Sequence, residues 1–211
     1  ERANAILKRP GWHQRFRRDD AERADQGDNE CAAGCRKAQE AVIQQALAIA
    51  GLAGHEVDYV ECHGTGTVLG DPVEVAALKS VMGPARHKPL VLGAVKTNIG
   101  HLEGAAGVIG LIKAVQVLQH RQAPGNVHFK TLNPKINLDG FAALIPTAVT
   151  HLGQANDARP LIAGVSSFGF GGTNAHVVLE SWQAPRKQTA SNNSRGNTAI
   201  SSENLVAGST L

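Results

Sequence analysis

Hydrophobic positions along the chain alternate between a helical period and short continuous runs. The first helical stretch has apolar residues about one turn apart and is followed by Gly51, the residue type that commonly ends a helix. Its apolar stripe consists of Ala38, Val42, Ile43, Ala46, Leu47 and Ala50. The spacing therefore predicts a helix from about residue 38 to residue 50 with one buried face.

A strand, a turn and a helix then follow one another twice. The first strand is predicted at 57–62 and leads through a glycine-threonine turn into a helix at about 73–82. This helix should be capped by Asp71, with Pro72 at its first position and Glu74 completing a capping box. The second strand is predicted at 90–95, followed by a turn at 96–101.

The second of these helices should begin at Glu103 and turn one apolar face to the core. The residues expected on that face are Val108, Ile109, Ile112, Val115 and Leu118. Glycines three apart on the same helix lower its intrinsic stability, so we expect them to allow close approach to a neighbouring backbone. These glycines are Gly104, Gly107 and Gly110.

Further strands are predicted near 142–145, at 161–166 and at 175–180, the last two pairing across the glycine turn 169–172. The alternation of helices and strands predicts an α/β layered domain. It covers about residues 38–182. Residues 1–37 are polar and unpatterned, and residues 183–211 are rich in Ser and Asn, which is typical of a flexible tail.

Composition narrows the class of protein. The 211 residues, 42% of them hydrophobic, suffice for one domain with a core. Lys and Arg number 21 against 18 Asp and Glu, a balance that does not indicate nucleic-acid binding. No apolar run approaches the roughly 18 residues of a membrane span and no signal peptide is evident, so we expect a soluble, cytoplasmic chain without membrane contact. The 23 glycines indicate many tight turns.

Candidate chemistry lies where the predicted strands end. Three loops there carry His63, then Lys96 with His101, and then the turn with Phe168, and we expect one composite site. Two neutral imidazoles on separate loops suit an oxyanion hole, because each donates one N–H to an oxygen that gains negative charge. The other histidines, including His176, are interpreted as structural.

Two other kinds of site fit the sequence poorly. A zinc site would need four well-spaced ligands, and Cys31 and Cys35 have only His13 and His55 nearby, in unpatterned or loop sequence. A nucleotide site would need a glycine turn that opens a helix or precedes Lys-Ser/Thr, whereas the turn at 169–172 joins two strands. We therefore expect neither a bound metal nor a bound nucleotide.

Three ordered motifs resemble the later signatures of β-ketoacyl synthases, most closely the ketosynthase domains of modular type I polyketide synthases. The motifs are His63-Gly64-Thr65-Gly66-Thr67 with Gly70-Asp71-Pro72, Lys96-Thr97-Asn98-Ile99-Gly100-His101-Leu102-Glu103 and Ser167-Phe168-Gly169-Phe170-Gly171-Gly172-Thr173-Asn174. The resemblance implies the thiolase-like αβαβα fold, of which this chain would supply mainly the C-terminal half. Half a fold should expose apolar surface and be poorly soluble.

The resemblance implies a decarboxylative Claisen condensation between an acyl thioester and a malonyl-type unit on an acyl carrier protein. His63 and His101 would promote decarboxylation and stabilise the enolate oxygen. Lys96 would polarise the region of His101 through a network with Glu103, with a plain ion pair to Glu103 as the alternative. No cofactor would be bound, because the carrier protein delivers its own phosphopantetheine arm. The intact domain would be a homodimer and would not bind nucleic acid.

The remaining roles implied by the resemblance concern substrate contacts. Thr65 and Thr67 would bind the phosphopantetheine arm, with turn capping as the alternative. Phe168 and Phe170 would gate the acyl pocket, with core packing as the alternative, and Asn174 would brace their loop.

The sequence departs from the family at the nucleophile. The family uses a cysteine in a Thr-Ala-Cys-Ser-Ser type turn before the first histidine motif, and no such turn occurs here. Cys31 and Cys35 lack those neighbours, and Cys62 should point away from the site because side chains alternate along a strand. Residues 10–37 also match nothing expected of the family there. The alternative to a condensing enzyme is therefore an inactive half-domain or interaction fragment.

Overall fold

The computed structural model describes residues 5–8, 14–15, 29–153, 159–169 and 171–182, with side chains from residue 35 onward. The predicted tail at 183–211, most of the segment before residue 29, and Phe170 lie outside the described residues. Within the described part of the chain, no helix has the length and apolar character needed to cross a membrane.

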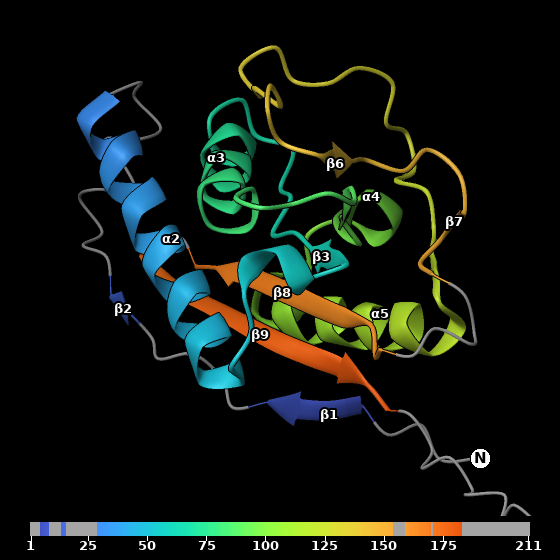
Figure 1. The fold of residues 1–211 in the computed structure, drawn as a ribbon. Helices are drawn as coiled ribbons and strands as arrows, with labels where there is room; N and C mark the ends of the chain where they lie inside the picture. Colours follow the sequence, from blue (N-terminus) through green and yellow to red (C-terminus); the bar gives the residue numbers. More distant parts are fainter. Residues whose placement is uncertain (1–4, 9–13, 16–28, 154–158, 170, 183–211) are drawn as a thin grey trace, which may run out of the picture.

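A mixed sheet organises the described chain (Figure 1). Its strands lie in the order β1-β9-β8-β3-β4-β6, and β2 also pairs with β9. The strands are β1 (Ala5–Lys8), β2 (Gln14–Arg15), β3 (Tyr59–Glu61), β4 (Leu90–Gly93), β6 (Ala143–Leu144), β8 (Ile162–Phe168) and β9 (Thr173–Ser181). The neighbours β8, β3, β4 and β6 are parallel, whereas β9 is antiparallel to β8 and to β1. A separate two-stranded ladder joins β5 (Gln122–Ala123) to β7 (Thr150–His151).

The predicted hairpin is confirmed. Strands β8 and β9 pair antiparallel from Ile162 opposite Glu180 to Phe168 opposite Asn174. The other predicted strands form at their predicted places but are shorter, with β3 three residues long and β6 two. The predicted α/β class is therefore confirmed.

Helices cover both faces of this sheet. They are α2 (Asn29–Ala50), α3 (Gly70–Met82), the one-turn α4 (Lys96–Ile99) and α5 (Ala106–His120), with short 3-10 turns η1 (Gly54–Glu56) and η2 (Glu103–Ala105). Side chains alternate between faces along each strand. Thus Val60 and Val178 pack with the cluster of α2 and α3, while Tyr59 and Leu179 pack with the cluster of α5.

Helix α2 begins nine residues earlier than predicted. The apolar stripe from residue 38 marks only the part that packs on the protein core, and Val42, Ile43 and Ala46 are buried there as expected. Its first residues carry no apolar period, so the pattern could not reveal them. The end is as predicted, because Gly51 has a φ of +68° and the Leu52 N–H bonds the Leu47 carbonyl at 3.0 Å.

The predicted start of α3 is wrong. The helix begins at Gly70 with Leu69 as N-cap and no side-chain cap, so Asp71 and Pro72 lie inside the first turn. Neither Asp71 nor Glu74 forms the predicted capping box. Instead, the Thr67 hydroxyl accepts the Gly70 N–H at 3.1 Å, which is the capping alternative considered for that threonine.

The face that α5 turns to the sheet also differs from the prediction. Small residues Ala106, Gly110 and Ala114 are buried against the sheet, whereas Val108 and Ile112 are 55% and 51% exposed. Leu118 is buried as expected, and Val115 packs partly against the same core cluster, so the prediction is correct for this end of the helix. The small residues let the helix approach the strands closely, so the larger apolar residues one turn apart remain on the open side.

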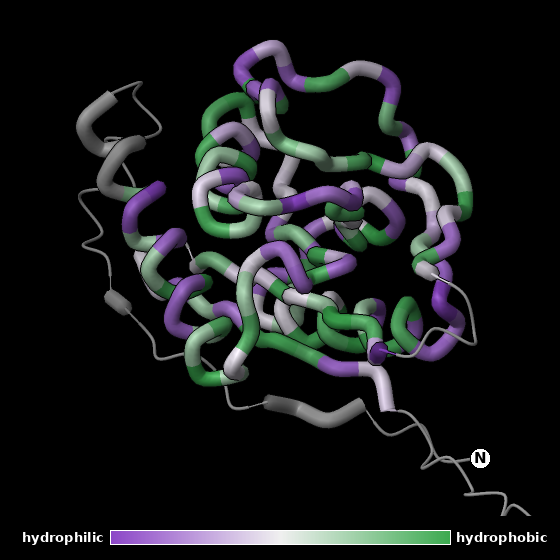
Figure 2. Tube along the Cα trace, in the orientation of Figure 1, coloured by the Kyte–Doolittle hydropathy of each residue, from purple (hydrophilic) through white to green (hydrophobic). Residues whose placement is uncertain are grey.

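The expectation of exposed apolar surface is confirmed, since Ile99 and Leu102 are also exposed near the start of α5. Figure 2 shows the hydropathy of each residue along the chain: hydrophobic residues are concentrated on β8, β9 and α5, whereas hydrophobic and hydrophilic residues alternate along α2. The predicted poor solubility stays a prediction.

Candidate functional site

Three loops meet at one edge of the sheet. Strands β3, β4 and β8 are parallel, so their carboxyl ends lie together. The loop after β3 carries His63, the junction after β4 carries α4 and then His101, and β8 ends at Phe168. The composite grouping predicted for these residues is what the structure shows, whereas the roles assigned to them remain predictions.

His63 lies at the centre of this edge. Its ring centroid is 5.8 Å from that of His101, in an edge-on arrangement, and 5.5 Å from that of Phe168. Burial, followed by the charges of Lys96 and His101, lowers the pKa of His63 to about 4. His63 is therefore a neutral imidazole near pH 7.

Hydrogen bonds assign the same tautomer to both imidazoles. The Phe168 N–H donates to His63 Nδ1 at 3.3 Å, and the Glu103 N–H donates to His101 Nδ1 at 3.0 Å. A ring nitrogen that accepts carries no proton, so in a neutral ring the proton is on Nε2. Each histidine thus keeps one N–H for another acceptor, as the oxyanion-hole interpretation requires.

The predicted link between Lys96 and Glu103 is wrong. Lys96 Nζ donates to the His63 backbone carbonyl at 2.5 Å, and no ion pair joins it to Glu103 among the described residues. Glu103 is exposed, and it contributes its backbone N–H to His101. Lys96 therefore holds the His63 loop directly.

Sequence reasoning missed two carboxyl groups because it assigned them to helix capping. The side chain of Glu74 is buried and accepts the backbone N–H groups of His63 at 2.7 Å and Gly64 at 2.9 Å. Asp71, three residues earlier on the same helix, accepts the Gly66 N–H at 3.1 Å. The i, i+3 spacing places both on one side of α3, toward the loop, and this was the available signal.

Burial raises the pKa of Glu74 to about 7, although its two backbone hydrogen bonds oppose this shift. The pKa of Asp71 is also raised, chiefly by burial. Lys96 is half-buried nearby, and burial lowers its pKa. The histidine loop therefore rests on carboxyl groups of raised pKa, and that of Glu74 is poised to change charge near neutral pH.

A cavity of about 490 Å³ opens beside these loops. Its lining includes Thr65, Lys96, Asp71 and Glu74, with the segment from Asn126 to Asn133 also contributing. Thr65 lines the cavity, whereas Thr67 is not part of the lining and bonds Gly70 instead. Of the two threonines predicted to bind the phosphopantetheine arm, the structure thus leaves Thr65 beside open space.

The cysteines are placed as follows. Cys31 and Cys35 lie on α2, at a distance along the chain from the histidine loops. Cys62 packs partly against the core cluster of α2 and α3, as predicted, but it also lines the cavity, which was not predicted. Burial raises the pKa of the Cys62 thiol well above its usual range, so it carries little thiolate.

The remaining predicted residues lie at the turn between β8 and β9. Phe168 contacts the His63 ring and also packs partly on the core, so the packing alternative is observed and the gating of an acyl pocket stays a prediction. Asn174 is buried on β9 opposite Phe168. His176 is fully buried and its Nδ1 lies 3.0 Å from the Ser166 hydroxyl, which agrees with a structural role.

Comparisons with solved structures define the class. The chain superimposes on a ketosynthase of the bacillaene polyketide synthase from Bacillus amyloliquefaciens with a TM-score of 0.66 and 39% identity, covering 70% of this chain and 26% of that one. An oxazolomycin ketosynthase domain from Streptomyces albus gives the same TM-score at 37% identity, covering 72% of this chain and 28% of that one. The fold is therefore that of ketosynthases, which is thiolase-like.

The family follows from the sequence matches. The model of the beta-ketoacyl synthase C-terminal domain matches residues 19–130, and that of the ketoacyl-synthetase C-terminal extension matches residues 133–209. The chain belongs to the β-ketoacyl synthase family. The match begins within the stretch 10–37, so the expectation that this whole stretch resembles nothing in the family is wrong from residue 19 onward. The domain boundaries at 37 and 182 stay predictions.

The chain is also similar to parts of very long polyketide synthases. A phenolphthiocerol/phthiocerol polyketide synthase of Mycobacterium tuberculosis is 47% identical over 176 residues, which are 82% of this chain and 9% of that protein. Erythronolide synthase EryA2 of Saccharopolyspora erythraea is 45% identical over 172 residues, 82% of this chain and 5% of that protein. The chain thus spans less than a tenth of the length of these relatives.

Proposed function

We propose that this chain forms the C-terminal half of the condensation site of a polyketide synthase ketosynthase. One observation carries the proposal: the imidazole rings of His63 and His101 lie edge-on with centroids 5.8 Å apart, and the Nδ1 of each accepts a backbone N–H. In our proposal, the Nε2–H groups that remain donate to a single oxygen.

In the proposed reaction, a malonyl-type thioester on an acyl carrier protein loses carbon dioxide. The electron pair of the broken carbon–carbon bond becomes an enolate, and its oxygen accepts hydrogen bonds from His63 and His101. The enolate carbon then attacks the carbonyl of an acyl thioester, the new carbon–carbon bond forms, and the thiolate leaves. Lys96 keeps the His63 loop in place through the His63 carbonyl.

The acyl-carrying thiolate must come from elsewhere in the domain. Among the described side chains, Cys62 has a thiol pKa raised by burial, and it neighbours His63 on an alternating strand end. The chain covers about a quarter of the solved ketosynthases, which leaves room for the cysteine in the part outside this sequence. The phosphopantetheine arm would contact Thr65 beside the cavity. A homodimer of the intact domain stays a prediction.

The experiment supplies the chain with malonyl-loaded acyl carrier protein and follows conversion to the acetyl form by mass spectrometry. We expect slow decarboxylation that falls at least tenfold in His63→Ala and in His101→Ala, in line with the loss of an oxyanion donor. His120→Ala, an exposed histidine at the end of α5, is the matched control and should keep the rate.

Two results would contradict the proposal. An unchanged rate in His63→Ala would remove its assigned role. An acyl group found on Cys35 or Cys62 would show that the nucleophile is within this chain.

A further inference from the structure

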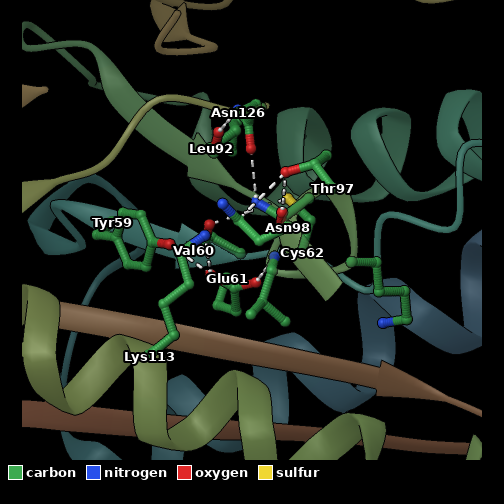
Figure 3. Close-up of polar contacts among 12 residues, drawn as sticks. Tyr59, Val60, Glu61, Cys62, Leu92, Thr97, Asn98, Lys113 and Asn126 are labelled. Atoms are coloured by element: carbon green, nitrogen blue, oxygen red, sulfur yellow. Dashed lines mark hydrogen bonds and ion pairs between the residues drawn. The ribbon is translucent and has the colours of Figure 1, made fainter. Parts of the chain in front are cut away.

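A fully buried carboxylate lies on the α5 face of the sheet, in the last residue of β3 and two residues before His63 (Figure 3). Glu61, on β3, is 1% exposed. Its Oε2 accepts the Tyr59 hydroxyl and lies 3.0 Å from Lys113 Nζ on α5, and its Oε1 accepts the Val95 N–H at 2.5 Å. One side chain thus joins β3 to the segment that follows β4 and to helix α5.

Two glycines make room for this group. A Cβ at Gly93 would overlap the Tyr59 hydroxyl oxygen, and a Cβ at Gly110 would lie 3.2 Å from Glu61 Cγ. The glycines of α5 were expected to admit a neighbouring backbone, but Gly110 admits this side chain instead. Glycine at these two positions therefore leaves the space that the Tyr59 and Glu61 side chains occupy.

The contact with Val95 falls directly before Lys96. From the other side, Asn126 Oδ1 accepts the Ala94 N–H at 2.8 Å and its Nδ2 donates to the Leu92 carbonyl at 3.1 Å (Figure 3). The end of β4 is thus held from both sides. Lys96 follows at once and bonds the His63 carbonyl, and His101 follows five residues later.

We propose that Glu61 is a positioning residue. It accepts the Val95 N–H through one oxygen, while Lys113 and Tyr59 hold the other. This contact fixes the position of the segment from Val95 to Lys96, and through Lys96 and the residues after it the positions of the two imidazoles. The consequence for catalysis rests on the proposed function, but the positioning itself does not. Glu61 touches no reacting atom and acts through the backbone.

A purely structural ion pair would stabilise the fold without affecting the histidines. The difference is measurable, because the low pKa of His63 depends on its burial and on the nearness of Lys96 and His101. If the junction moves, the His63 ring gains solvent and its pKa rises toward its ordinary value near 6.5. Nitrogen-15 NMR of the imidazole rings reports both the pKa and the tautomer.

The decisive pair of variants is Glu61→Leu/Lys113→Met and Glu61→Gln/Lys113→Met. Both remove the buried charges together, so neither leaves an unpaired ion. Only the Gln variant keeps an oxygen for the Val95 N–H. We expect the His63 pKa to rise from about 4 by more than one unit in the Leu variant, with faster exchange of the Val95 amide, and to stay near 4 in the Gln variant.

A control at the other end of β3 has the same charge type. Asp58 pairs with Arg159 and accepts the Ile162 N–H at 2.9 Å, so Asp58→Asn should lower stability without moving the His63 pKa. An unchanged pKa in the folded Leu variant would overturn the proposal, as would an equal rise in Asp58→Asn. If the Leu variant does not fold, a raised pKa in the Gln variant still overturns it.

These readouts need no turnover, so the two proposals can fail separately. A shifted His63 pKa with no decarboxylation by the unaltered chain would remove the proposed function and leave the positioning role. Decarboxylation that is lost in His63→Ala but kept in the Leu variant, with its pKa unchanged, would do the reverse.

Discussion

The two faces of the sheet bury polar groups by opposite means. The α2 and α3 face encloses His176, a neutral imidazole that lies beside Gly164. The Nε2 of His176 has no hydrogen-bond partner among the described residues. The α5 face encloses the Glu61 and Lys113 charge pair, with each Glu61 oxygen accepting at least one hydrogen bond. An unpartnered neutral group becomes costly when it is protonated, whereas a satisfied charge pair is costly when one member is removed.

The helices on the two faces also differ in how far their apolar side chains are exposed. Helices α2 and α3 pack on the sheet through apolar side chains that are fully buried, such as Ile43 and Leu78. The α5 layer leaves Val108 and Ile112 on its open side. We therefore expect the buried side chains of both faces to stabilise the isolated chain, and the exposed apolar side of α5 to contribute little until it is covered.

The largest expected effect tests this contrast in apolar packing. Leu78→Ala removes a fully buried side chain from α3 and should lower the free energy of unfolding by about 3 kcal/mol. Ile112→Ala, on the open side of α5, should change it by less than about 0.5 kcal/mol. Urea unfolding followed by circular dichroism measures both. Equal losses would mean that the open side of α5 is covered in solution.

The next effect tests the buried imidazole. Burial lowers the pKa of His176 to about 4 in the folded chain, whereas an unfolded histidine has a pKa near 6.5. The unfolded chain therefore binds this proton first, so the contribution is full above pH 6.5 and is lost as the pH falls through about 4. The loss amounts to about 3 kcal/mol.

Urea unfolding at a series of pH values, compared between the unaltered chain and His176→Leu, isolates this contribution. His63, whose pKa is lowered in the same direction, is present in both chains and cancels. The His176→Leu chain should lose less free energy of unfolding between pH 6.5 and 4 than the unaltered chain. Parallel curves would show that His176 is not protonated on unfolding in this range.

The smallest effect tests how tightly the α5 face encloses its polar group. Gly93→Ala places a Cβ against the Tyr59 hydroxyl and should cost about 2 kcal/mol through overpacking. Gly104→Ala meets no atom within 4 Å and should cost less than about 0.5 kcal/mol. Thermal unfolding compares them. A Gly93→Ala cost that persists in a Tyr59→Leu background would place the strain elsewhere.

Much of the fold could be predicted from local patterns. The helix stripe ending at Gly51 and the hairpin of β8 and β9 depend on residues close in sequence, and both were correct. The histidine loops were found because glycine-rich turns after strands have a recognisable composition. Their mutual approach also follows from parallel strands, whose ends share one edge of a sheet.

The errors arose where two explanations fit one local pattern. Asp71, Pro72 and Glu74 have the spacing of a capped helix, but the two carboxylates bind loop backbone instead. On α5, the larger apolar residues suggested the inward face, yet the small residues face the sheet. Hydrophobic spacing gives the period of a helix, and the choice between faces depends on the partner.

Local patterns of residues were enough to establish the α/β class, the order of strands and helices, and the family to which the histidine motifs belong. Three features emerged only from the packed chain: the tautomers of His63 and His101, the bond of Lys96 to the His63 carbonyl, and the enclosure of Glu61 by its neighbours. The two groups of features differ in range. Periodicity and turn chemistry act within a few residues, whereas most of these hydrogen bonds join groups that become neighbours only when the sheet and its helices are packed.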